Sequence, residues 1–306
     1  MRGGVVDLAE RAVVLRGTGG VWVVRTAAGD TREVALRGRL KQDADLKLAV
    51  GDDVMIARDT RSEHWTIEDI LPRRSVLARG APGGRPGERI LAVNVDQVLV
   101  VFAAAQPEPH RRMIDRFLVI AEGSHLVGRL VVNKIDLVEL PVVHERFRDY
   151  GEAGYPVHYT SARTGSGLDT LHPVLAGRTT AVAGPSGVGK SSLLNALYPT
   201  LDLRVGAISA SVNKGRHTTV GAWSHPLPEG GFVVDTPGLR EVGMWQMSAE
   251  GLDQCFPEFR PFIRSCRFAD CTHVVEPGCA VREALGQGAV SAERYESYVK
   301  LRGTRD

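Results

Sequence analysis

The stretch TTAVAGPSGVGKSSLLNAL (residues 179–197) contains an apolar run, a glycine-rich loop and the start of a helical pattern. Its centre, Gly184–Ser191, has the form G-x-x-x-x-G-K-[ST] between a predicted strand and a predicted helix. In such a loop the glycines let successive backbone N–H groups point at phosphate oxygens, and the helix adds the positive end of its dipole. Lys190 is expected to contact the outer phosphates and to act in catalysis, and Ser191 is expected to bind Mg²⁺. The nucleotide contacts predicted from this loop are Gly184, Pro185, Ser186, Gly187, Val188, Gly189, Lys190, Ser191 and Ser192.

A second motif, NKID at residues 133–136, follows the apolar run Leu130–Val132. A carboxylate after a strand can accept hydrogen bonds from N1–H and the 2-amino group of guanine, a donor pair that adenine lacks. NKxD at a strand end resembles the base-specificity motif of GTP-binding proteins. By that resemblance Asn133 braces the loop, Lys134 lays its stem on the base, and Asp136 reads the base. Ser161 and Ala162 resemble the loop whose backbone N–H meets the guanine carbonyl, so GTP is the expected nucleotide and an ATPase is disfavoured.

A third motif, DTPG at residues 235–238, ends the apolar run Phe232–Val234. Asp235 is expected to reach Mg²⁺ through water, and the Gly238 N–H to meet the γ-phosphate and report its loss. Many GTPases place glutamine directly after DxxG to orient the attacking water, but here that position is Leu239. Because an apolar side chain cannot orient water, either hydrolysis is very slow or another group orients the water, and His217 is the nearest candidate.

The order of the motifs is unusual. Ordinary small GTPases have the phosphate loop, DxxG, NKxD and SA in that order, whereas here NKxD and SA come first. Joining the usual ends and opening the chain elsewhere gives the same sheet, so the order predicts a circularly permuted GTPase domain. From about Ile90, strand-like runs alternate with helical stretches, which predicts a mostly parallel α/β sheet covered by helices on both faces.

The first ninety residues have short valine-rich runs separated by Gly and Asp turns, which predicts five short strands. Their number and spacing fit a small closed barrel, an OB-fold or an SH3-like barrel. The Gly-, Pro- and Arg-rich stretch Arg79–Arg89 that follows is predicted to be a linker or loop. The predicted strands are Ala12–Leu15, Val21–Arg25, Glu33–Leu36, Val54–Ala57 and Trp65–Ile70.

After residue 248, four potential ligands have the spacing C-x4-C-x-H-x5-C. Three thiolates and one imidazole form a closed tetrahedral site without an open position, so we expect one structural zinc ion that orders a short tail. Cys255 lies outside this spacing and is interpreted as a buried thiol. The predicted zinc ligands are Cys266, Cys271, His273 and Cys279.

The motif order, the barrel and the cysteine-rich tail together resemble the RsgA-type, ribosome small-subunit-dependent GTPases. Stretches that carry the resemblance include LPRRSVLAR (71–79), GRHTT (215–219), DTPGLREVGMW (235–245) and CFPEF (255–259); Thr236, within the third, departs mildly from the family pattern. The resemblance implies His217 as a catalytic residue and the small ribosomal subunit with its rRNA as partner. In the switch-like segment Lys214–Thr219, Thr218 or Thr219 is the expected further Mg²⁺ ligand, and Thr219 is the preferred one. It implies a GTPase that the small subunit activates and that acts as a late assembly checkpoint, with GTP and GDP as its nucleotides.

The chain has 306 residues, of which 38 are Lys or Arg and 36 are Asp or Glu, giving 38 − 36 = +2. That balance excludes a strongly basic nucleic-acid coat, although a local basic face stays open. With no apolar run long enough to span a bilayer, we expect a cytoplasmic monomer without a membrane partner. The alternative is a GTP-dependent switch that recruits a protein effector. The residues with a predicted RNA contact are Arg37, Arg39, Lys41, Arg73 and Arg74.

The sequence therefore predicts a multidomain protein. Residues 1–88 form an OB-fold-like RNA-binding barrel, residues 89–247 the permuted GTPase domain, and residues 248–306 a mostly helical zinc-binding tail.

Overall fold

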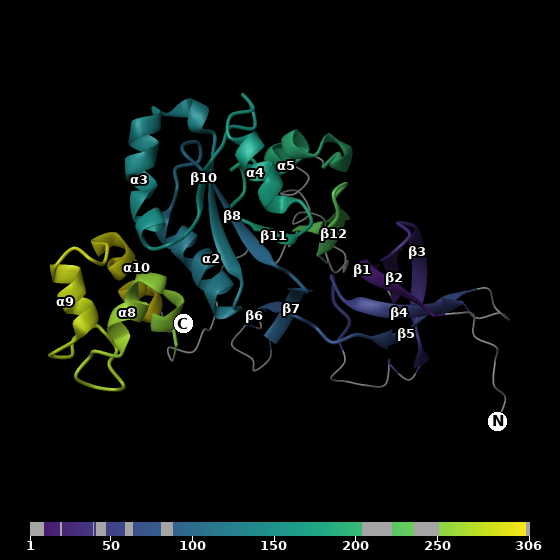
Figure 1. The fold of residues 1–306 in the computed structure, drawn as a ribbon, viewed down its shortest axis with the longest axis horizontal. Coiled ribbons are helices and arrows are strands. Elements are labelled where there is room, and N and C mark those ends of the chain that lie inside the picture. The colour runs from purple at the N-terminus through teal and green to yellow at the C-terminus, as the bar shows by residue number, and fades with distance from the viewer. Residues whose placement is uncertain are drawn as a thin grey trace, which may run out of the picture.

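The computed structural model describes residues 9–18, 20–38, 40, 47–58, 64–80, 88–203, 222–235 and 251–303. Figure 1 shows three parts, with the barrel and the tail on opposite sides of a central sheet. In the described part of the chain, no helix combines the length and apolar character needed to cross a bilayer.

The predicted five-stranded barrel is confirmed. Its strands close in the order β1-β2-β3-β5-β4, with a parallel β3–β5 pair among otherwise antiparallel neighbours. This is the Greek-key order of an OB-fold, which decides between the two barrels that the sequence left open. Alternate side chains such as Val14, Val24 and Ile56 fill the interior because successive strand residues point to opposite faces. The strands are β1 (Glu10–Thr18), β2 (Val21–Thr26), β3 (Thr31–Leu36), β4 (Asp53–Arg58) and β5 (Trp65–Ile70).

The prediction of a linker or loop over Arg79–Arg89 is wrong at both ends of that stretch. Strand β6 (Val76–Gly80) pairs antiparallel with β7 (Glu88–Val93), so this stretch contributes residues to a hairpin. The hairpin lies between the barrel and the central sheet (Figure 1). The hairpin packs closely against the barrel at Gly51. A side chain is excluded there, because Gly51 has a φ of 91° and a Cβ would lie 2.2 Å from the Val93 carbonyl oxygen.

The central sheet has six strands in the order β10-β9-β8-β11-β13-β12. The first five run parallel and β12 is an antiparallel edge strand that the sequence analysis missed. All seven residues of β8 are buried because helices cover both faces of the sheet. The strands are β8 (Gln97–Ala103), β9 (Val127–Asn133), β10 (Val157–Tyr159), β11 (Thr179–Ala183), β12 (Trp223–Pro226) and β13 (Phe232–Asp235).

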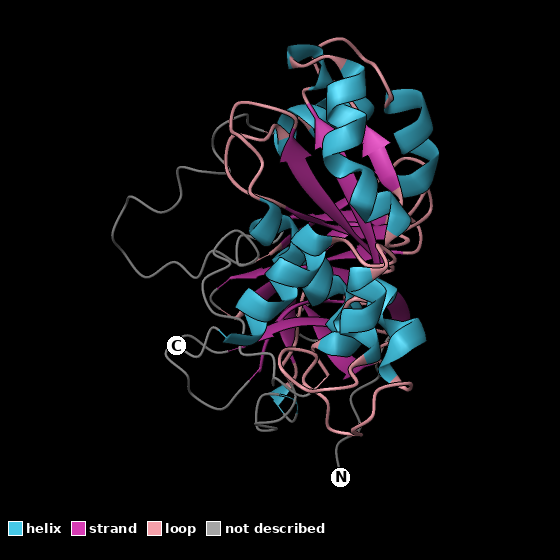
Figure 2. Cartoon of the chain, turned by 90° about the vertical axis from the view of Figure 1, so that its left-hand side faces the viewer, coloured by secondary structure: helices cyan, strands magenta, loops and turns pink. Residues whose placement is uncertain are grey.

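Helices cover the sheet in two layers (Figure 2). Val98, Val100 and Phe102 of β8 pack with α2 and α3, whereas Leu99 and Val101 pack with α4 and α5. Because successive side chains of β8 point to opposite faces of the sheet, one pair of helices packs on each face. The helices are α2 (Arg111–Gly123), α3 (Leu140–Glu152), α4 (Leu168–Leu175) and α5 (Lys190–Leu197), with short helices η1 (Ile135–Leu137) and η2 (Pro199–Leu201).

The tail has its own small core, which includes Phe256, Phe259, Val281 and Tyr298. Because Phe256 and Phe259 stack while Tyr298 meets both edge-on, aromatic contacts hold the short helices together. The elements are η3 (Asp253–Cys255), η4 (Pro257–Phe259), α8 (Arg260–Ile263), α9 (Ala280–Gly286) and α10 (Ala292–Gly303).

One buried guanidinium joins the tail to the central α/β domain. Arg294 of α10 is 0% exposed and donates to Asp115 of α2 at 2.6 Å and to Glu258 at 2.7 Å and 3.2 Å. Near the other end of α2, Glu122 accepts a charged hydrogen bond from Arg260. The tail therefore docks on α2.

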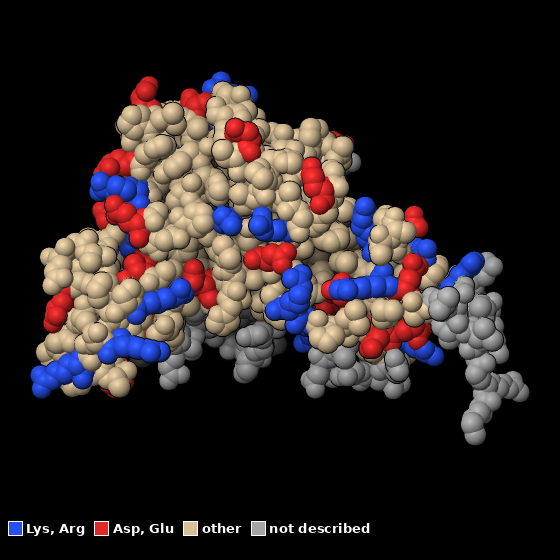
Figure 3. All heavy atoms as spheres, viewed as in Figure 1, with Lys and Arg blue, Asp and Glu red and all other residues tan. Residues whose placement is uncertain are grey.

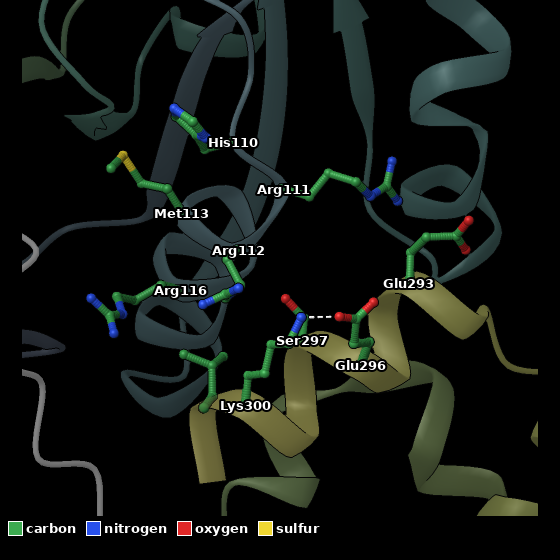
Figure 4. Close-up of a pocket in the computed structure, with 10 residues that line it drawn as sticks. His110, Arg111, Arg112, Met113, Arg116, Glu293, Glu296, Ser297 and Lys300 are labelled. Carbon is green, nitrogen blue, oxygen red and sulfur yellow. Dashed lines mark hydrogen bonds and ion pairs between the residues drawn. The ribbon is translucent and has the colours of Figure 1, made fainter. Parts of the chain in front are cut away.

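A groove of about 480 Å³ marks the outer edge of this joint. Figure 4 shows Arg112 and Arg116 of α2 on one wall and Glu296 and Lys300 of α10 on the other. Lys300 and Glu296 form an ion pair with each other, so the groove carries charges of both signs.

Candidate functional site

The glycine-rich loop between β11 and α5 has the backbone conformation that its motif predicts. Gly184 has a φ of 137°, and a Cβ there would lie 2.1 Å from the Val101 carbonyl oxygen. Gly189 precedes the first turn of α5 with a φ of 92°. Lys190 is nearly buried, and its Nζ donates to the carbonyl oxygens of Gly184 at 2.8 Å and Pro185 at 2.6 Å. The loop is thus wrapped around its own lysine.

Asn133, at the end of β9, connects three loops. Its Nδ2 donates to the Val188 carbonyl of the phosphate loop at 3.0 Å. Its Oδ1 accepts from the Thr160 hydroxyl at 3.3 Å and from the Ala162 N–H at 3.2 Å. The side chain is 1% exposed, so these bonds are made where water does not compete. One amide therefore fixes the NKID, SA and phosphate loops relative to one another.

Lys134 lies in the left-handed region with a φ of 61°. Its Nζ donates to the Gly187 carbonyl at 2.7 Å and also to the Gln106 carbonyl. The lysine stem consequently runs from the NKID loop to the phosphate loop. Gln106 belongs to the loop between β8 and α2, which the sequence analysis did not connect with the site.

Asp136 accepts hydrogen bonds on both carboxylate oxygens. Ser161 Oγ donates to Oδ1, while Arg163 donates to Oδ2 through Nε at 2.8 Å and Nη2 at 2.6 Å. The hydrogen bond from Ser161 and the adjacent charge of Arg163 lower the pKa of Asp136, against the effect of burial. Arg163 was not singled out from the sequence, although it directly follows Ser161 and Ala162.

Asp235 ends β13, which runs parallel to β11 and pairs Asp235 with Val182. The carboxylate therefore lies one strand away from the start of the phosphate loop. On its other side β13 pairs with β12, where Trp223 is the residue opposite Asp235. The centroid of the Trp223 ring lies 5.4 Å from that of His225, on which it stacks, and 4.4 Å from the guanidinium carbon of Arg16 in the barrel. The predicted residues His217, Thr219 and Gly238 lie outside the described residues, as does Thr236.

The four predicted zinc ligands come together in the tail. Their ligand atoms all lie within 4.8 Å of one another, and His273 Nδ1 is 3.5 Å from the sulfur atoms of both Cys266 and Cys279. Zn–S bonds of about 2.3 Å and a Zn–N bond of about 2.0 Å at tetrahedral angles place S and N about 3.5 Å apart. His273 Nε2 lies 3.4 Å from Asp253, the carboxylate partner typical of a zinc-binding histidine. The cluster therefore fits a zinc ion.

Cys255 is separate from this cluster. Its sulfur lies 3.5 Å from the Gly251 carbonyl, and burial raises the pKa of its thiol to about 11. The prediction of a buried thiol agrees with this environment.

A family model described as RsgA GTPase matches residues 70–245, more than half of the chain. The chain belongs to the RsgA GTPase family. It is 62% identical over 293 residues to the small ribosomal subunit biogenesis GTPase RsgA of Gemmatimonas aurantiaca, with 95% of each chain covered. It is 39% identical over 278 residues to the protein of that name from Agathobacter rectalis, covering 90% of this chain and 88% of the relative.

Two solved structures are also similar. YjeQ from Thermotoga maritima gives a TM-score of 0.80 at 36% identity, covering 96% of this chain and 98% of that one. YloQ, described as a circularly permuted GTPase, gives 0.75 at 28% identity, covering 99% and 96%. The predicted permuted fold and the GTPase class are therefore confirmed for this RsgA-family chain.

Two arginines that we predicted to contact RNA have partners within the RsgA-family chain itself. Arg73 donates through Nε to Asp52 at 2.7 Å, and Asp52 is fully buried. Arg74 pairs with Asp96 at 3.0 Å. The Arg73–Asp52 pair lies within the barrel part, at one end of the β4–β5 pair, whereas the Arg74–Asp96 pair connects the barrel part to the residue before β8.

A third such residue, Arg37, pairs with Glu68 of the neighbouring strand in the barrel. Arg39 and Lys41 lie outside the described residues. On the face seen in Figure 3, basic and acidic side chains of the described residues alternate over the barrel rather than forming a field of one sign.

Proposed function

We propose that this protein hydrolyses GTP to GDP and phosphate when it docks on the small ribosomal subunit. In this proposal it acts as a late checkpoint of subunit assembly. The contact made by Asn133 to both the phosphate loop and the SA loop carries the nucleotide assignment, because it brings three motifs to one edge of the sheet. The names of the relatives, small ribosomal subunit biogenesis GTPases, support the partner and a cytoplasmic location.

In the proposed site the phosphate loop surrounds the phosphates with backbone N–H groups. Lys190 would leave its contacts with the loop carbonyls and neutralise the outer phosphates. Asp136 would read the guanine, while Lys134 packs its stem on the base and Ala162 meets the base carbonyl with its N–H. Gly238 would contact the γ-phosphate.

A magnesium site fits the same geometry. Ser191 has a nearly buried hydroxyl directly after Lys190, and Asp235 ends a strand next to the one that leads into the loop. Hydroxyl and carboxylate oxygens are the ligands that Mg²⁺ prefers. We propose Ser191, Asp235 and Thr219 as its protein contacts, and the ion would neutralise charge that develops on the phosphates.

We propose His217 as the residue that orients the attacking water. Leu239 follows DTPG, and its side chain has no group that could hold water. A histidine can polarise water near neutral pH. If docking on the subunit positions His217, hydrolysis reports correct docking.

We further propose three domains, residues 1–88, 89–247 and 248–306, in a monomer. The first boundary falls at the first residue of β7, between the barrel and the central sheet. In this proposal the barrel contacts rRNA, the GTPase domain holds the nucleotide, and the tail contains one structural zinc ion.

Addition of small ribosomal subunits is expected to raise the rate of GTP hydrolysis strongly, while large subunits have no effect. His217→Ala is expected to lower the stimulated rate about 100-fold, the order of effect of a residue that positions or activates a reactant. The measurement is phosphate release at saturating GTP, with nucleotide affinity determined for each variant. A rate that is the same with and without small subunits would contradict the proposed partner and favour an unrelated protein effector.

Removal of zinc is expected to unfold the tail but not the central sheet, because metal binding supplies the folding energy of such small sites. The measurement is hydrogen exchange of residues 251–303 before and after treatment with a chelator, together with metal content. Cys271→Ser is expected to lose the single zinc equivalent. Cys255→Ala is a matched control because it removes a buried thiol of the same tail outside the cluster. Zinc retained by Cys271→Ser, or lost from Cys255→Ala, would refute the ligand set.

A further inference from the structure

The acceptor capacity of Asp136 is almost fully used within the protein. Its Oδ1 accepts one hydrogen bond from Ser161, and its Oδ2 accepts two from Arg163. A carboxylate offers about four lone-pair positions, so about one is left, on Oδ1. Guanine presents two donors to this carboxylate, N1–H and the 2-amino group, and a planar contact needs one acceptor position on each oxygen.

Arg163, not Ser161, is the partner that can leave. Ser161 is fully buried, and its hydroxyl also accepts from the Thr164 N–H at 3.2 Å. The Arg163 side chain is 72% exposed, against 10% for Asp136, and Asp136 is its partner among the described residues. Water can solvate a released guanidinium at this position, whereas a released Ser161 hydroxyl would stay buried.

We propose that Arg163 modulates base specificity by competing with guanine for Oδ2 of Asp136. The proposal rests on the function proposed above, in which Asp136 reads the base. Hypoxanthine, the base of inosine nucleotides, has the same 6-oxo group and N1–H but no 2-amino group. It needs only the acceptor position that remains on Oδ1, so it binds without displacing Arg163. Arg163 therefore lowers the preference for guanine over hypoxanthine below what Asp136 alone would give.

The comparison of GDP with IDP isolates this competition. Replacing Arg163 also removes a group that orients Asp136, but that loss applies to both bases and cancels in the ratio of their dissociation constants. Only the competition for Oδ2 distinguishes them. Exposed ion pairs contribute modestly, so we expect Arg163→Ala to raise the ratio of the IDP to the GDP dissociation constant about two- to fivefold.

The experiment measures both dissociation constants by displacement of a fluorescent GDP analogue from the full chain. Arg163→Lys, which offers a point charge without the planar fork, is expected to give an intermediate ratio. Arg178→Ala is the matched control, because Arg178 is an exposed arginine of the same domain that donates to main-chain carbonyls. Raising the salt concentration is expected to increase the ratio for the wild-type protein and not for Arg163→Ala, since salt weakens the exposed pair.

If Arg163→Ala still binds GDP but its ratio of IDP to GDP dissociation constants is unchanged or lower, the inference about Arg163 is overturned and the proposed function is not affected. A wild-type protein without preference for GDP over ADP would instead overturn the proposed function. The two failures are therefore distinguishable in one series of measurements.

Discussion

Asp136→Asn is expected to weaken GTP binding at least about 100-fold and to let the site bind xanthosine nucleotides, because sites built on hydrogen bonds to a base discriminate strongly. The variant replaces an acceptor oxygen with an NH₂ donor, which then faces a donor of guanine. Xanthine has a carbonyl oxygen where guanine has the 2-amino group, so the same amide finds an acceptor. Ser161 and Arg163 would also lose the negative charge that now holds them.

The measurement is the dissociation constant of GTP and XTP for the wild-type protein and the variant. Asp169→Asn, at an exposed position in the first turn of α4, is the matched control and is expected to leave both constants unchanged. A variant that still prefers GTP to XTP would show that Asp136 does not read the base.

Arg294→Ala is expected to destabilise the docked tail by about 3–5 kcal/mol, because breaking a buried ion pair leaves uncompensated charge behind. Here two carboxylates, Asp115 and Glu258, would lose the same guanidinium. The cavity would add to the cost, since the guanidinium also packs over the Phe256 ring at 4.7 Å and the Tyr155 ring at 5.4 Å.

The free energy of unfolding in urea tests this expectation, and hydrogen exchange in α2 and α10 localises the change. Arg264→Ala, an exposed arginine of the same tail, is expected to change stability by less than about 0.5 kcal/mol. If Arg294→Ala lost no more stability than this control, the buried cluster would not be what holds the tail on α2.

The sequence predicted those features whose functional groups lie close together along the chain. The phosphate loop, NKID and the cysteine spacing each place reacting or ligating groups within a few residues, so their local geometry could be predicted. Strand β12 has four residues and gains its pairing from β13, so no periodicity marked it. The hairpin of β6 and β7 was hidden by the glycines and prolines between its strands.

Contacts between distant residues could not be predicted in this way. Arg294 and Asp115 are 179 residues apart, and nothing in either neighbourhood indicates an ion pair. Arg73 looked like a basic surface residue because its partner, Asp52, lies 21 residues earlier in the chain and meets it only when β4 and β5 pair. Arg163 is different, since its position directly after Ser161 and Ala162 was a local signal that a cation lies near Asp136.

The permuted strand order has a consequence for the protein during its own synthesis. Translation produces β8, β9 and β10, with the loops proposed to read guanine, before it produces β11 and the phosphate loop. Asp115 likewise emerges long before Arg294, so a growing chain carries this carboxylate without its counter-charge. A nascent chain that ends before β11 therefore has a half-site for the base and none for the phosphates. Such fragments cannot bind GTP productively, and in the proposed function they do not compete with the finished protein for assembling subunits.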